Sequence, residues 1–380
     1  MAITLLLNAM TVIWLTATPF LMLLIIQTIR LHRAHPLFHN DPNRFIIQIT
    51  TNSRDSKSVN KMIKMIKTHQ YPFSYEIWVV IEEAAHQNYF GADRILKVPT
   101  KFETPNKTLY KARALEYARE VRISEGIETN KTKILFLDDD NRPSKQYIEK
   151  AFHSPFDLSQ GILKSKRQDN EGSLLTVVAD YTRTAVCIGY CSFFNSRHNP
   201  RLVHGEGLVI KANVERETTW DFGKTFAEDL IFGRRASKRF TFGFIPETLD
   251  ITAPKSIKDL FIQRRRWFWG NVTAMRQIDL SERIFLLANT MMSTIGGLSV
   301  GAITIILVSG THLPLISLIA LGISTTAWVS QYIVGCAVNT KSATSVFKTV
   351  FLMYPASLIS TAVSIAVLFS KPKTFDIIQK

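Results

Sequence analysis

Hydrophobic residues are distributed along this chain in two ways. Four stretches are apolar over a length that crosses the roughly 30 Å hydrocarbon core of a bilayer as a helix. These stretches are residues 2–29, 284–309, 313–338 and 346–369. Between the first and the second stretch, the chain is polar overall and its apolar residues come in short runs. We therefore expect one N-terminal and three C-terminal membrane helices, with a polar domain between them.

The apolar stretches divide the chain into three predicted parts. They are an N-terminal transmembrane helix within residues 1–35, one polar domain over residues 36–282 and a C-terminal transmembrane domain over residues 283–380. No basic residue precedes the first stretch, and no small-x-small cleavage site follows it. We therefore expect a retained anchor rather than a removed signal peptide.

The polar domain alternates between short apolar runs and amphipathic segments. Strands are predicted at residues 45–50, 76–81 and 134–137, with a further one beginning at Lys97-Val98, and helices at residues 59–69 and 111–122. The first helix has a packing side made of Met62, Ile63, Met65 and Ile66. This alternation indicates an α/β fold whose mostly parallel sheet is covered on both faces. Ligands of such sheets bind at the carboxyl ends of the strands.

The balance of charge favours a lipid surface over a nucleic acid. The chain has 46 Lys and Arg against 31 Asp and Glu, a net charge of +15. Much of the excess lies beside apolar stretches, at residues 30–67 and 255–283, where it suits anionic headgroups and a phosphorylated lipid. The same flanks place the polar domain in the cytoplasm of a multi-pass cell-membrane protein. The tail residues Lys371, Lys373 and Lys380 oppose this orientation, and we expect the earlier signals to decide.

Cysteine and histidine give no strong metal pattern. The three cysteines, Cys187, Cys191 and Cys336, lack any four-ligand zinc spacing. Cys187-x-x-x-Cys191 is a weak metal signal, and we interpret all three as reduced packing thiols. The nine histidines show no metal-ligand spacing of their own.

Two acidic islands carry candidate chemistry. Asp138-Asp139-Asp140 follows an apolar strand, where carboxylates suit a divalent cation that holds a phosphate. A solvated turn has the same composition. Glu228-Asp229 contains a carboxylate that can deprotonate an acceptor hydroxyl. Acidic residues also stabilise a helix N-terminus without any chemistry.

A basic island precedes the second apolar stretch. Residues 263–267 read Gln-Arg-Arg-Arg-Trp, and on a helix Gln263, Arg266 and Trp267 share one face. That face is expected to meet the active site, while Phe268 lies elsewhere, partly toward the membrane surface. The arginines can hold a diphosphate, and the tryptophan offers a flat face to a sugar. An interfacial basic-aromatic helix has the same pattern, and interfacial helices are expected near residues 254–270. The three islands together predict sugar transfer from a nucleotide donor at a membrane.

The islands resemble the motifs of membrane family 2 glycosyltransferases, the group that contains cellulose and hyaluronan synthases. Residues 136–143 (FLDDDNRP) are similar to the D-x-D-x-x-P turn of that family. Glu228-Asp229 is similar to its acceptor-side acidic pair, and residues 263–267 to its Q-x-x-R-W helix. The order and the spacing also match, so the resemblance does not depend on one motif.

A closer resemblance lies in the segments between the first and the second acidic island. Residues 203–210 (VHGEGLVI), 214–217 (VERE) and 220–223 (WDFG) resemble the egghead-type β-1,4-mannosyltransferases of animals. The whole chain resembles small archaeal mannosyltransferases with a minimal cellulose-synthase-like fold. The resemblance implies a GT-A catalytic domain.

The resemblance also implies roles for individual residues. Asp229 is the expected general base, supported by Glu228, and Asp139 is expected to point to the opposite face. The divalent cation, Mn²⁺ or Mg²⁺, is expected on Asp138 and Asp140. The nucleotide sugar is expected at Thr51, Asn52, Arg54, Glu82, Lys111, Asp138, Asp139 and Arg266. The acceptor is expected at His204, Glu206, Gln263, Arg264 and Trp267. Four of these assignments have open alternatives, namely a plain polar turn at Thr51, Asn52 and Arg54, Glu83 for Glu82, a surface role for Lys111 and a plain glycine turn at His204.

The function implied is an inverting transfer of mannose from GDP-mannose to a polyprenyl-linked saccharide, in the manner of lipid-linked oligosaccharide assembly. The alternative is a processive polysaccharide synthase that uses a UDP- or GDP-sugar. Such a synthase needs a transmembrane channel, and four spans with hardly a polar lining residue argue against one. A non-catalytic membrane scaffold is disfavoured because the acidic motifs are intact.

Overall fold

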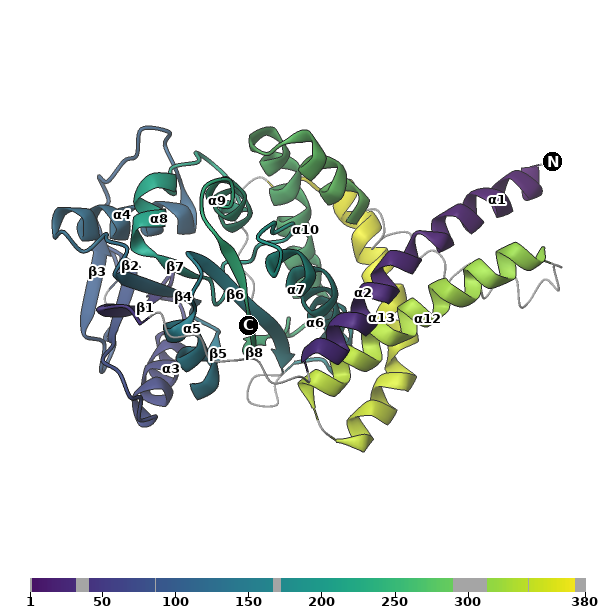
Figure 1. The fold of residues 1–380 in the computed structure, drawn as a ribbon, viewed down its shortest axis with the longest axis horizontal. Helices are drawn as coiled ribbons and strands as arrows, with labels where there is room; N and C mark the ends of the chain where they lie inside the picture. The colour runs from purple at the N-terminus through teal and green to yellow at the C-terminus, as the bar shows by residue number, and fades with distance from the viewer. Residues whose placement is uncertain are drawn as a thin grey trace.

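The computed structural model describes residues 2–31, 41–85, 87–166, 172–289, 313–340 and 342–372. A sheet-bearing domain lies on one side of the molecule, and long apolar helices extend from the other side (Figure 1). The helix α10 (Ile257–Ala274) lies where the two parts meet.

The sheet-bearing domain is built on one mixed sheet with the strand order β3-β2-β1-β4-β7-β6-β8-β5. The first four strands in that order are parallel, as are β6 and β8, whereas β7 and β5 pair antiparallel with their neighbours. The predicted α/β fold with a mostly parallel sheet is therefore confirmed. The strands are β1 (Arg44–Thr50), β2 (Glu76–Glu82), β3 (Arg94–Val98), β4 (Thr132–Asp138), β5 (Arg142–Pro143), β6 (Leu158–Lys166), β7 (Val209–Lys211) and β8 (Phe242–Thr252).

The parallel strands form where continuous apolar runs were found. β1, β2 and β4 are buried along almost their whole length, because helices cover both faces of the sheet. In register, Thr50 of β1 lies beside Asp138 of β4, which places the polar strand ends at one edge. The prediction that a strand begins at Lys97-Val98 was wrong, since β3 ends there. The start of β3 was missed because β3 is an edge strand with exposed side chains, and its charged residues interrupt the apolar pattern.

Two hydrophobic cores fill the faces of the sheet. On one face pack α3 (Ser56–Thr68) and α5 (Lys145–His153), and the core there includes Met62, Ile63 and Ile66. Met65 is only partly buried, so it lies at the margin of the predicted packing side. The other face carries α4 (Tyr110–Ser124), α8 (Ala212–Thr218) and α9 (Glu228–Ala236).

A third group of helices joins the sheet to the apolar helices. It consists of α6 (Leu174–Val186), the π-helical turn η1 (Cys187–Cys191) and α7 (Ser192–Asn195). The α6 helix contacts both β6 and the apolar helix α12 (Leu315–Asn339), while η1 packs on α2 (Ala17–Leu31). This segment therefore forms part of the contact between the apolar helices and the sheet.

The first apolar stretch forms two helices in line, α1 (Ala2–Leu15) and α2. They are separated at Thr16, three residues before Pro19. Proline lacks the N–H of a helical residue and its ring crowds the carbonyl four residues earlier, here that of Leu15, which explains the break.

Three helical segments in the described part of the chain are long and apolar enough to cross a membrane. They are residues Asn8–Leu31, Leu315–Asn339 and Ala343–Leu368, the last two being α12 and α13. Large apolar side chains on them, such as Met22 and Leu315, are exposed, as expected of a lipid-facing surface. Most of the predicted span at residues 284–309 lies outside the described residues, which here reach residue 289.

The interfacial helix predicted near residues 254–270 corresponds to α10, which begins at a serine cap and ends in the short turn η2 (Met275–Gln277). Its contact with α13 includes a hydrogen bond from Trp269 Nε1 to the carbonyl oxygen of Val367, at 2.9 Å. The helix that carries the basic island is thus fixed to an apolar helix.

Candidate active site

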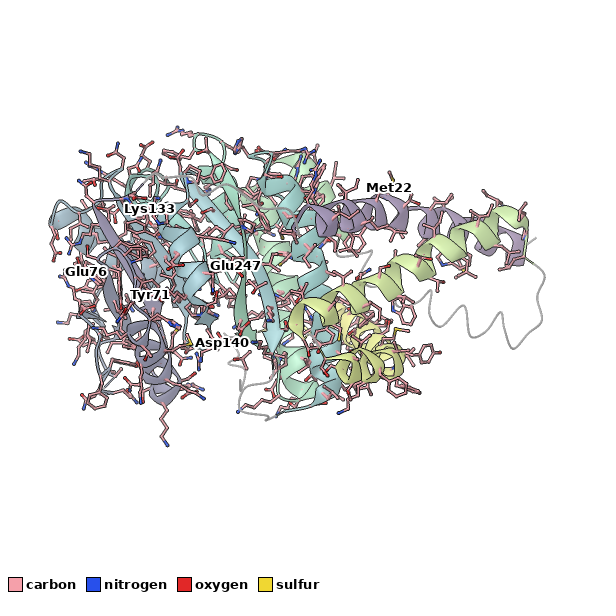
Figure 2. All side chains as sticks on the ribbon, turned by 60° about the horizontal axis from the view of Figure 1, so that its bottom comes forward. Met22, Tyr71, Glu76, Lys133, Asp140 and Glu247 are labelled. Atoms are coloured by element: carbon pink, nitrogen blue, oxygen red, sulfur yellow. The ribbon has the colours of Figure 1, made fainter. Side chains whose placement is uncertain are left out.

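A cavity of about 1300 Å³ opens between the carboxyl edge of the sheet, α10 and the apolar helices α12 and α13. Asp140 lies on the sheet-bearing part, away from Met22 on the extending helices (Figure 2). Of the sixteen residues expected at the site, fifteen line this cavity. They are Thr51, Asn52, Arg54, Glu82, Lys111, Asp138, Asp139, Asp140, His204, Glu206, Glu228, Asp229, Arg264, Arg266 and Trp267. The exception is Gln263.

The acidic turn after β4 is held by its own hydrogen bonds. The backbone N–H of Asp138 donates to Asn141 Oδ1 at 2.9 Å, and the N–H of Asn141 donates back to the Asp138 carbonyl at 3.2 Å. Asp140 is only 4% exposed, and its backbone carbonyl accepts a bond from Thr252 Oγ1 at 3.2 Å. The turn therefore presents its carboxylates from a fixed backbone.

The expectation that Asp139 points to the opposite face was wrong. Its Oδ2 accepts a hydrogen bond from Thr51 Oγ1 at 2.9 Å, and both residues line the cavity. The chain leaves the strand geometry after Asp138, so the alternation of side chains across the sheet no longer applies to Asp139. The Thr51–Asp139 bond joins the polar ends of β1 and β4.

Lys111 lies at the start of α4 and forms an ion pair with Asp138. Burial opposes its charge, yet the carboxylates of Asp138 and Glu228 outweigh this and raise the pKa of Lys111. A surface role is therefore excluded, because the ammonium is held among the acidic residues of the cavity. Tyr110, just before it, has a φ of 61°, so the backbone is strained where it enters the site.

The structure distinguishes Glu82 from Glu83. Glu82 lines the cavity and pairs with Arg113 at 2.7 Å, whereas Glu83 accepts a bond from the Thr100 N–H at 2.7 Å. Only the first of the two therefore reaches the candidate nucleotide side.

Asp229 lies in the first turn of α9 and is held by two backbone donors. Its Oδ2 accepts from the Gly205 N–H at 2.7 Å, and its Oδ1 accepts from the Leu230 N–H at 2.8 Å. These bonds fix the orientation of the carboxylate and leave further lone pairs for a proton. Burial raises the pKa of Asp229, although Lys111 and the two N–H groups oppose the rise.

The neighbouring Glu228 has the more perturbed carboxyl group. Burial, followed by the charge of Asp229, raises the pKa of Glu228 to about 7, against the lowering effect of Lys111. When two adjacent carboxyls have different environments, one can act as a proton acceptor while the other acts as a supporting group.

Trp267 on α10 is enclosed by two arginines. The guanidinium carbons of Arg183 and Arg264 each lie 4.6 Å from the centroid of its ring. Arg183 pairs with Glu206 at 2.8 Å, and Arg264 pairs with Asp180 at 2.7 Å. Cation–π contacts of this kind hold an aromatic ring in place. The orientation of Trp267 therefore depends on α6, which carries Asp180 and Arg183.

The predicted active face of α10 was only partly correct. Gln263 is 1% exposed and does not line the cavity, while Phe268, expected elsewhere, does line it. Helix α10 packs on α13, and its Gly270 lies close to the backbone of Phe226, so protein contacts on more than one side decide which of its residues are exposed. Helical spacing gives the neighbours of a residue but does not give the direction of a face.

The cavity also has a polar lining that the sequence analysis missed. It includes Arg183 and Lys255, and it continues along the apolar helices through Ser324, Gln331, Ser357, Ser360, Thr361 and Ser364. The statement that the spans have hardly a polar lining residue was therefore wrong. These serines and threonines are spread singly in apolar stretches, so hydropathy averages conceal them.

One known protein family matches most of the chain. The profile described as "Glycosyl transferase family group 2" matches residues 133–367, which include the acidic turn, Asp229 and the whole of α10. The chain belongs to this family.

Two relatives of the glycosyltransferase chain are β-1,4-mannosyltransferases. The egh protein of Drosophila melanogaster is 27% identical over 206 residues, which is 52% of this chain and 44% of the fly protein. The bre-3 protein of Caenorhabditis elegans is 29% identical over 189 residues, 47% of this chain and 40% of the worm protein. The chain thus spans less than half the length of these curated relatives.

The fold of the glycosyltransferase resembles that of a solved archaeal protein. Mannosyltransferase PcManGT from Pyrobaculum calidifontis, solved in complex with GDP-Man and Mn2+, matches with a TM-score of 0.51 over 96% of this chain and 98% of that protein. The sequences are 13% identical, so the likeness concerns the fold alone. The GT-A fold implied by the motifs is confirmed, whereas an archaeal origin of the chain has no support from these likenesses.

Two of the three egghead-like segments, residues 214–217 and 220–223, lie behind the site rather than in it. Asp221 accepts bonds from Thr104 and Thr108 hydroxyls, each at 2.6 Å, and from the Asn106 N–H at 2.9 Å. Glu215 forms a buried ion pair with Arg122. These contacts fix the loop that leads into α4 and hence Lys111.

The donor set of the acidic turn fits a hard divalent cation. Asp138 and Asp140 both line the cavity, and carboxylate oxygens are the ligands that Mg²⁺ and Mn²⁺ prefer. In the described ranges, no third acidic, histidine or cysteine side chain completes a three-ligand site with these two. Such cations commonly use one or two carboxylates and take further ligands from substrate phosphates. The fit therefore requires the diphosphate of a donor.

Proposed function

We propose that this chain is an inverting mannosyltransferase that transfers mannose from GDP-mannose to a polyprenyl-linked saccharide and forms a β-linkage. The observation that carries the proposal is the position of Asp229. Its carboxylate is held by two backbone N–H groups in the same cavity as the acidic turn and the basic island of α10. The candidate proton acceptor, the acidic turn that would hold the phosphates and the arginines of α10 thus line the same cavity.

The donor is assigned to the carboxyl edge of the sheet. Thr51, Asn52 and Arg54 at the end of β1 line that edge together with Glu82 and Lys111. Backbone and side-chain donors there suit a nucleoside diphosphate. Mannose is proposed because the two curated relatives are named as mannosyltransferases, and GDP because the protein that shares this fold was solved with GDP-Man.

A divalent cation on Asp138 and Asp140 would neutralise charge on the diphosphate as it leaves. Arg266 lines the same cavity and adds a permanent positive charge for the departing group. Asp138 is already compensated by Lys111, so the acidic turn stays folded before a donor arrives.

The transfer step follows from the orientation of Asp229. An acceptor hydroxyl oxygen attacks the anomeric carbon of the donor sugar while its proton passes to the Asp229 carboxylate. The bond between that carbon and the phosphate oxygen breaks, and its electron pair leaves with the nucleoside diphosphate. Attack from the side opposite the leaving group inverts the anomeric centre, so an α-linked donor gives a β-linked product. The raised pKa of Asp229 makes the carboxylate a better base.

A lipid-linked acceptor is proposed from the shape of the cavity. It is lined on one side by Trp267 and Phe268 of α10 and continues beside α12 and α13, which are apolar enough to lie in a membrane. A saccharide on a polyprenyl phosphate would present its first sugars at this depth. We propose that the active site faces the cytoplasm, as the basic flanks of the apolar stretches indicate.

One observation favours the processive alternative. The serines, threonine and glutamine of α12 and α13 give the cavity a polar extension, which a growing polymer could use. The described part of the chain has three candidate spans.

The two functions differ in the length of the product. Purified full-length protein in lipid nanodiscs is supplied with GDP-mannose, Mn²⁺ and a polyprenyl-linked saccharide, and products are analysed by mass. We expect the acceptor to gain one or a few hexoses, and Asp229→Asn to add them at least about 10²-fold more slowly. A long polysaccharide, or equal use of free oligosaccharide, would favour the synthase. Transfer from UDP-sugars in place of GDP-mannose would overturn the donor assignment.

A further inference from the structure

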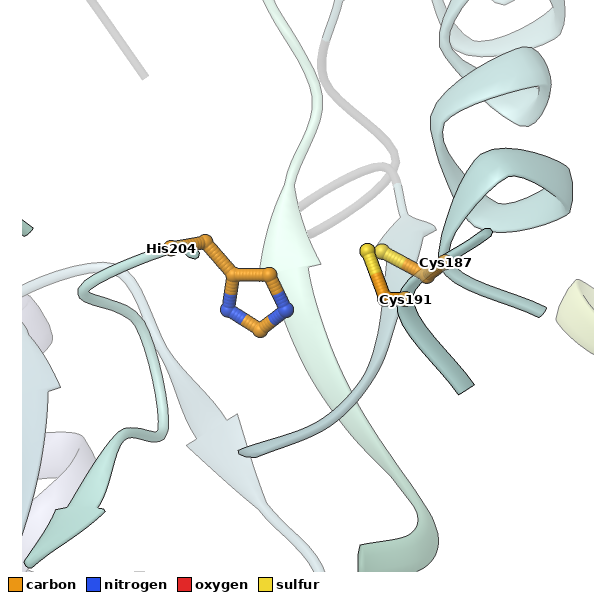
Figure 3. A group of neighbouring side chains, drawn as sticks. All are labelled: Cys187, Cys191 and His204. Carbon is orange, nitrogen blue, oxygen red and sulfur yellow. The ribbon is translucent and has the colours of Figure 1, made fainter. Parts of the chain in front are cut away.

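Three side chains that the proposed transfer does not use meet beside the acceptor end of the cavity. The sulfur atoms of Cys187 and Cys191 and a ring nitrogen of His204 all lie within 4.8 Å of one another. Figure 3 shows the imidazole ring directed at the two sulfurs. The two cysteines begin and end the π-helical turn η1, while His204 comes from the loop before β7. The fold therefore brings together residues that sequence spacing does not connect.

The separations suit a tetrahedral metal ion. Ligands at the usual 2.0–2.3 Å from zinc lie roughly 3.3–3.8 Å apart. The three atoms need to approach by at most about 1.5 Å to reach that arrangement. Side-chain rotation can supply such a shift, and π-helical turns are frequent at functional sites.

The hydrogen bonds of His204 prepare its ring for a metal. Its Nδ1 lies 2.9 Å from the carbonyl oxygen of Glu206, which can only accept, so Nδ1 carries the proton. The lone pair is then on the buried Nε2, which faces the thiol of Cys187, a weak hydrogen-bond donor. Metal-bound histidines commonly donate their other nitrogen to a carbonyl in this way.

We propose that Cys187, Cys191 and His204 bind a zinc ion whose fourth position faces the cavity. Thiolate and imidazole ligands suit zinc, and two thiolates balance its charge, so the buried site is neutral. All three residues line the cavity, which gives a fourth ligand such as water a place. This site is separate from the acidic turn, whose oxygen ligands suit harder cations.

The zinc ion would fix the loop that holds the proposed base. His204 is followed by Gly205, whose N–H donates to Asp229 Oδ2 at 2.7 Å. On the other side, η1 packs closely on α2, since a Cβ on Gly189 would lie 3.2 Å from Phe20 Cε2. The ion thus links an apolar helix to the base through η1. This positioning role rests on the proposed function, whereas the presence of zinc does not.

Metal content tests the site without any measurement of sugar transfer. The full chain is purified in detergent from cells grown with added zinc, and bound metal per chain is measured by mass spectrometry. We expect close to one zinc ion per chain in the wild type and a loss of at least about tenfold in Cys187→Ser, Cys191→Ser and His204→Asn. Cys336→Ser is the matched control, because this buried cysteine lies on α12 outside the group. It should retain the zinc of the wild type.

A second measurement covers variants that fail to fold. Wild-type protein is stripped with chelator and titrated with Co²⁺, which should give thiolate-to-metal charge-transfer absorption and the strong visible bands of a tetrahedral site. Zinc should then displace the cobalt. Absence of both zinc and the cobalt spectrum would overturn the proposal, as would full zinc content in His204→Asn. A Cys187–Cys191 disulfide in the native protein, found by peptide mass, would also overturn it.

Discussion

The backbone N–H of Gly205 donates a hydrogen bond to Asp229 Oδ2 at 2.7 Å. This contact joins two segments that resemble different motifs, the glycine loop before β7 and the acidic pair at the start of α9. The contact is made within the protein, so the orientation of the proposed base does not depend on bound substrate. Removing or displacing this donor should therefore affect turnover more than donor binding.

Gly205→Ala tests this contact. An added Cβ would lie 3.1 Å from Lys111 Nζ and 3.4 Å from Asp229 Cβ, so the base or the lysine must shift. We expect kcat to fall by about tenfold or more, equivalent to about 1.4 kcal/mol of transition-state stabilisation, with donor Kd nearly unchanged. Gly322→Ala is the control, because its Cβ would meet nothing within 4 Å. Equal kcat in wild type and Gly205→Ala would show that the loop does not position the base.

Asp229→Asn separates proton transfer from binding. The amide keeps the size of the side chain and can still accept a bond from the Gly205 N–H, but it cannot take the acceptor proton. We expect turnover to fall by roughly 10²–10⁴-fold while GDP-mannose binding, measured by calorimetry, persists. Glu228→Gln should retain more activity, since Glu228 is assigned a supporting role. The reverse order of the two variants would exchange these assignments.

The raised pKa of Glu228 predicts how stability changes with pH. Its carboxyl titrates near 4.5 in the unfolded chain and at about 7 in the folded one. Between these values the unfolded chain releases a proton that the folded chain keeps, so folding becomes less favourable as pH rises from 4.5 to 7. Glu228→Gln lacks this proton. The Tm of the variant minus the Tm of the wild type, both measured in detergent, should therefore become more positive from pH 5 to pH 8.

The control for this pH dependence is Glu217→Gln, which alters an exposed carboxylate. Its Tm should follow that of the wild type across the same range. A constant difference between Glu228→Gln and the wild type would mean that Glu228 titrates normally in the folded protein.

Much of the site could be predicted because its residues follow local rules. Asp138 ends a buried strand and Thr51 follows another, and the carboxyl ends of parallel strands meet at one edge. Glu228 and Asp229 begin a helix beside that edge. The order of strands along the chain is thus enough to bring these candidate residues to one edge of the sheet without any knowledge of side-chain contacts.

The missed features depend on contacts between distant segments. Asp180 and Arg183 lie on α6, a mostly apolar helix for which the sequence predicted no role in the site. Both nevertheless take part in holding α10. His204 meets Cys187 and Cys191 only because the loop before β7 turns toward η1. The burial of Gln263 has the same origin, since packing against other elements decides which face of α10 is exposed.

The acidic turn predicts a dependence on divalent metal. Asp140→Asn keeps the shape of a side chain that is only 4% exposed but weakens its affinity for a cation. We expect GDP-mannose binding to be lost while Tm changes little, and chelator to abolish wild-type turnover until Mn²⁺ or Mg²⁺ is restored. Asp279→Asn, which alters a surface pair with Lys238, is the control. Full turnover in excess chelator would contradict a metal on the turn.

The pair formed by Arg264 and Asp180 predicts coupling between α10 and α6. Asp180 is fully buried, and its Oδ1 accepts from Arg264 while its Oδ2 accepts from Ser165 Oγ at 2.6 Å. Arg264→Gln leaves a buried carboxylate without its cation, and Asp180→Asn leaves a cation without its carboxylate, so each should lower Tm. The double variant removes both charges, and its Tm should fall by less than the sum of the two losses.

The same pair should affect the acceptor more than the donor. Arg264 stacks on Trp267, so its loss frees the ring that is proposed to contact the acceptor sugar. We expect Arg264→Gln to raise the acceptor KM by about tenfold or more while GDP-mannose hydrolysis changes little, because Arg266 still lines the donor side. Arg265→Gln is the matched control, since its guanidinium lies 5.3 Å from the Phe261 ring and it does not line the cavity. Equal effects of the two variants would mean that net charge, and not the orientation of Trp267, determines acceptor use.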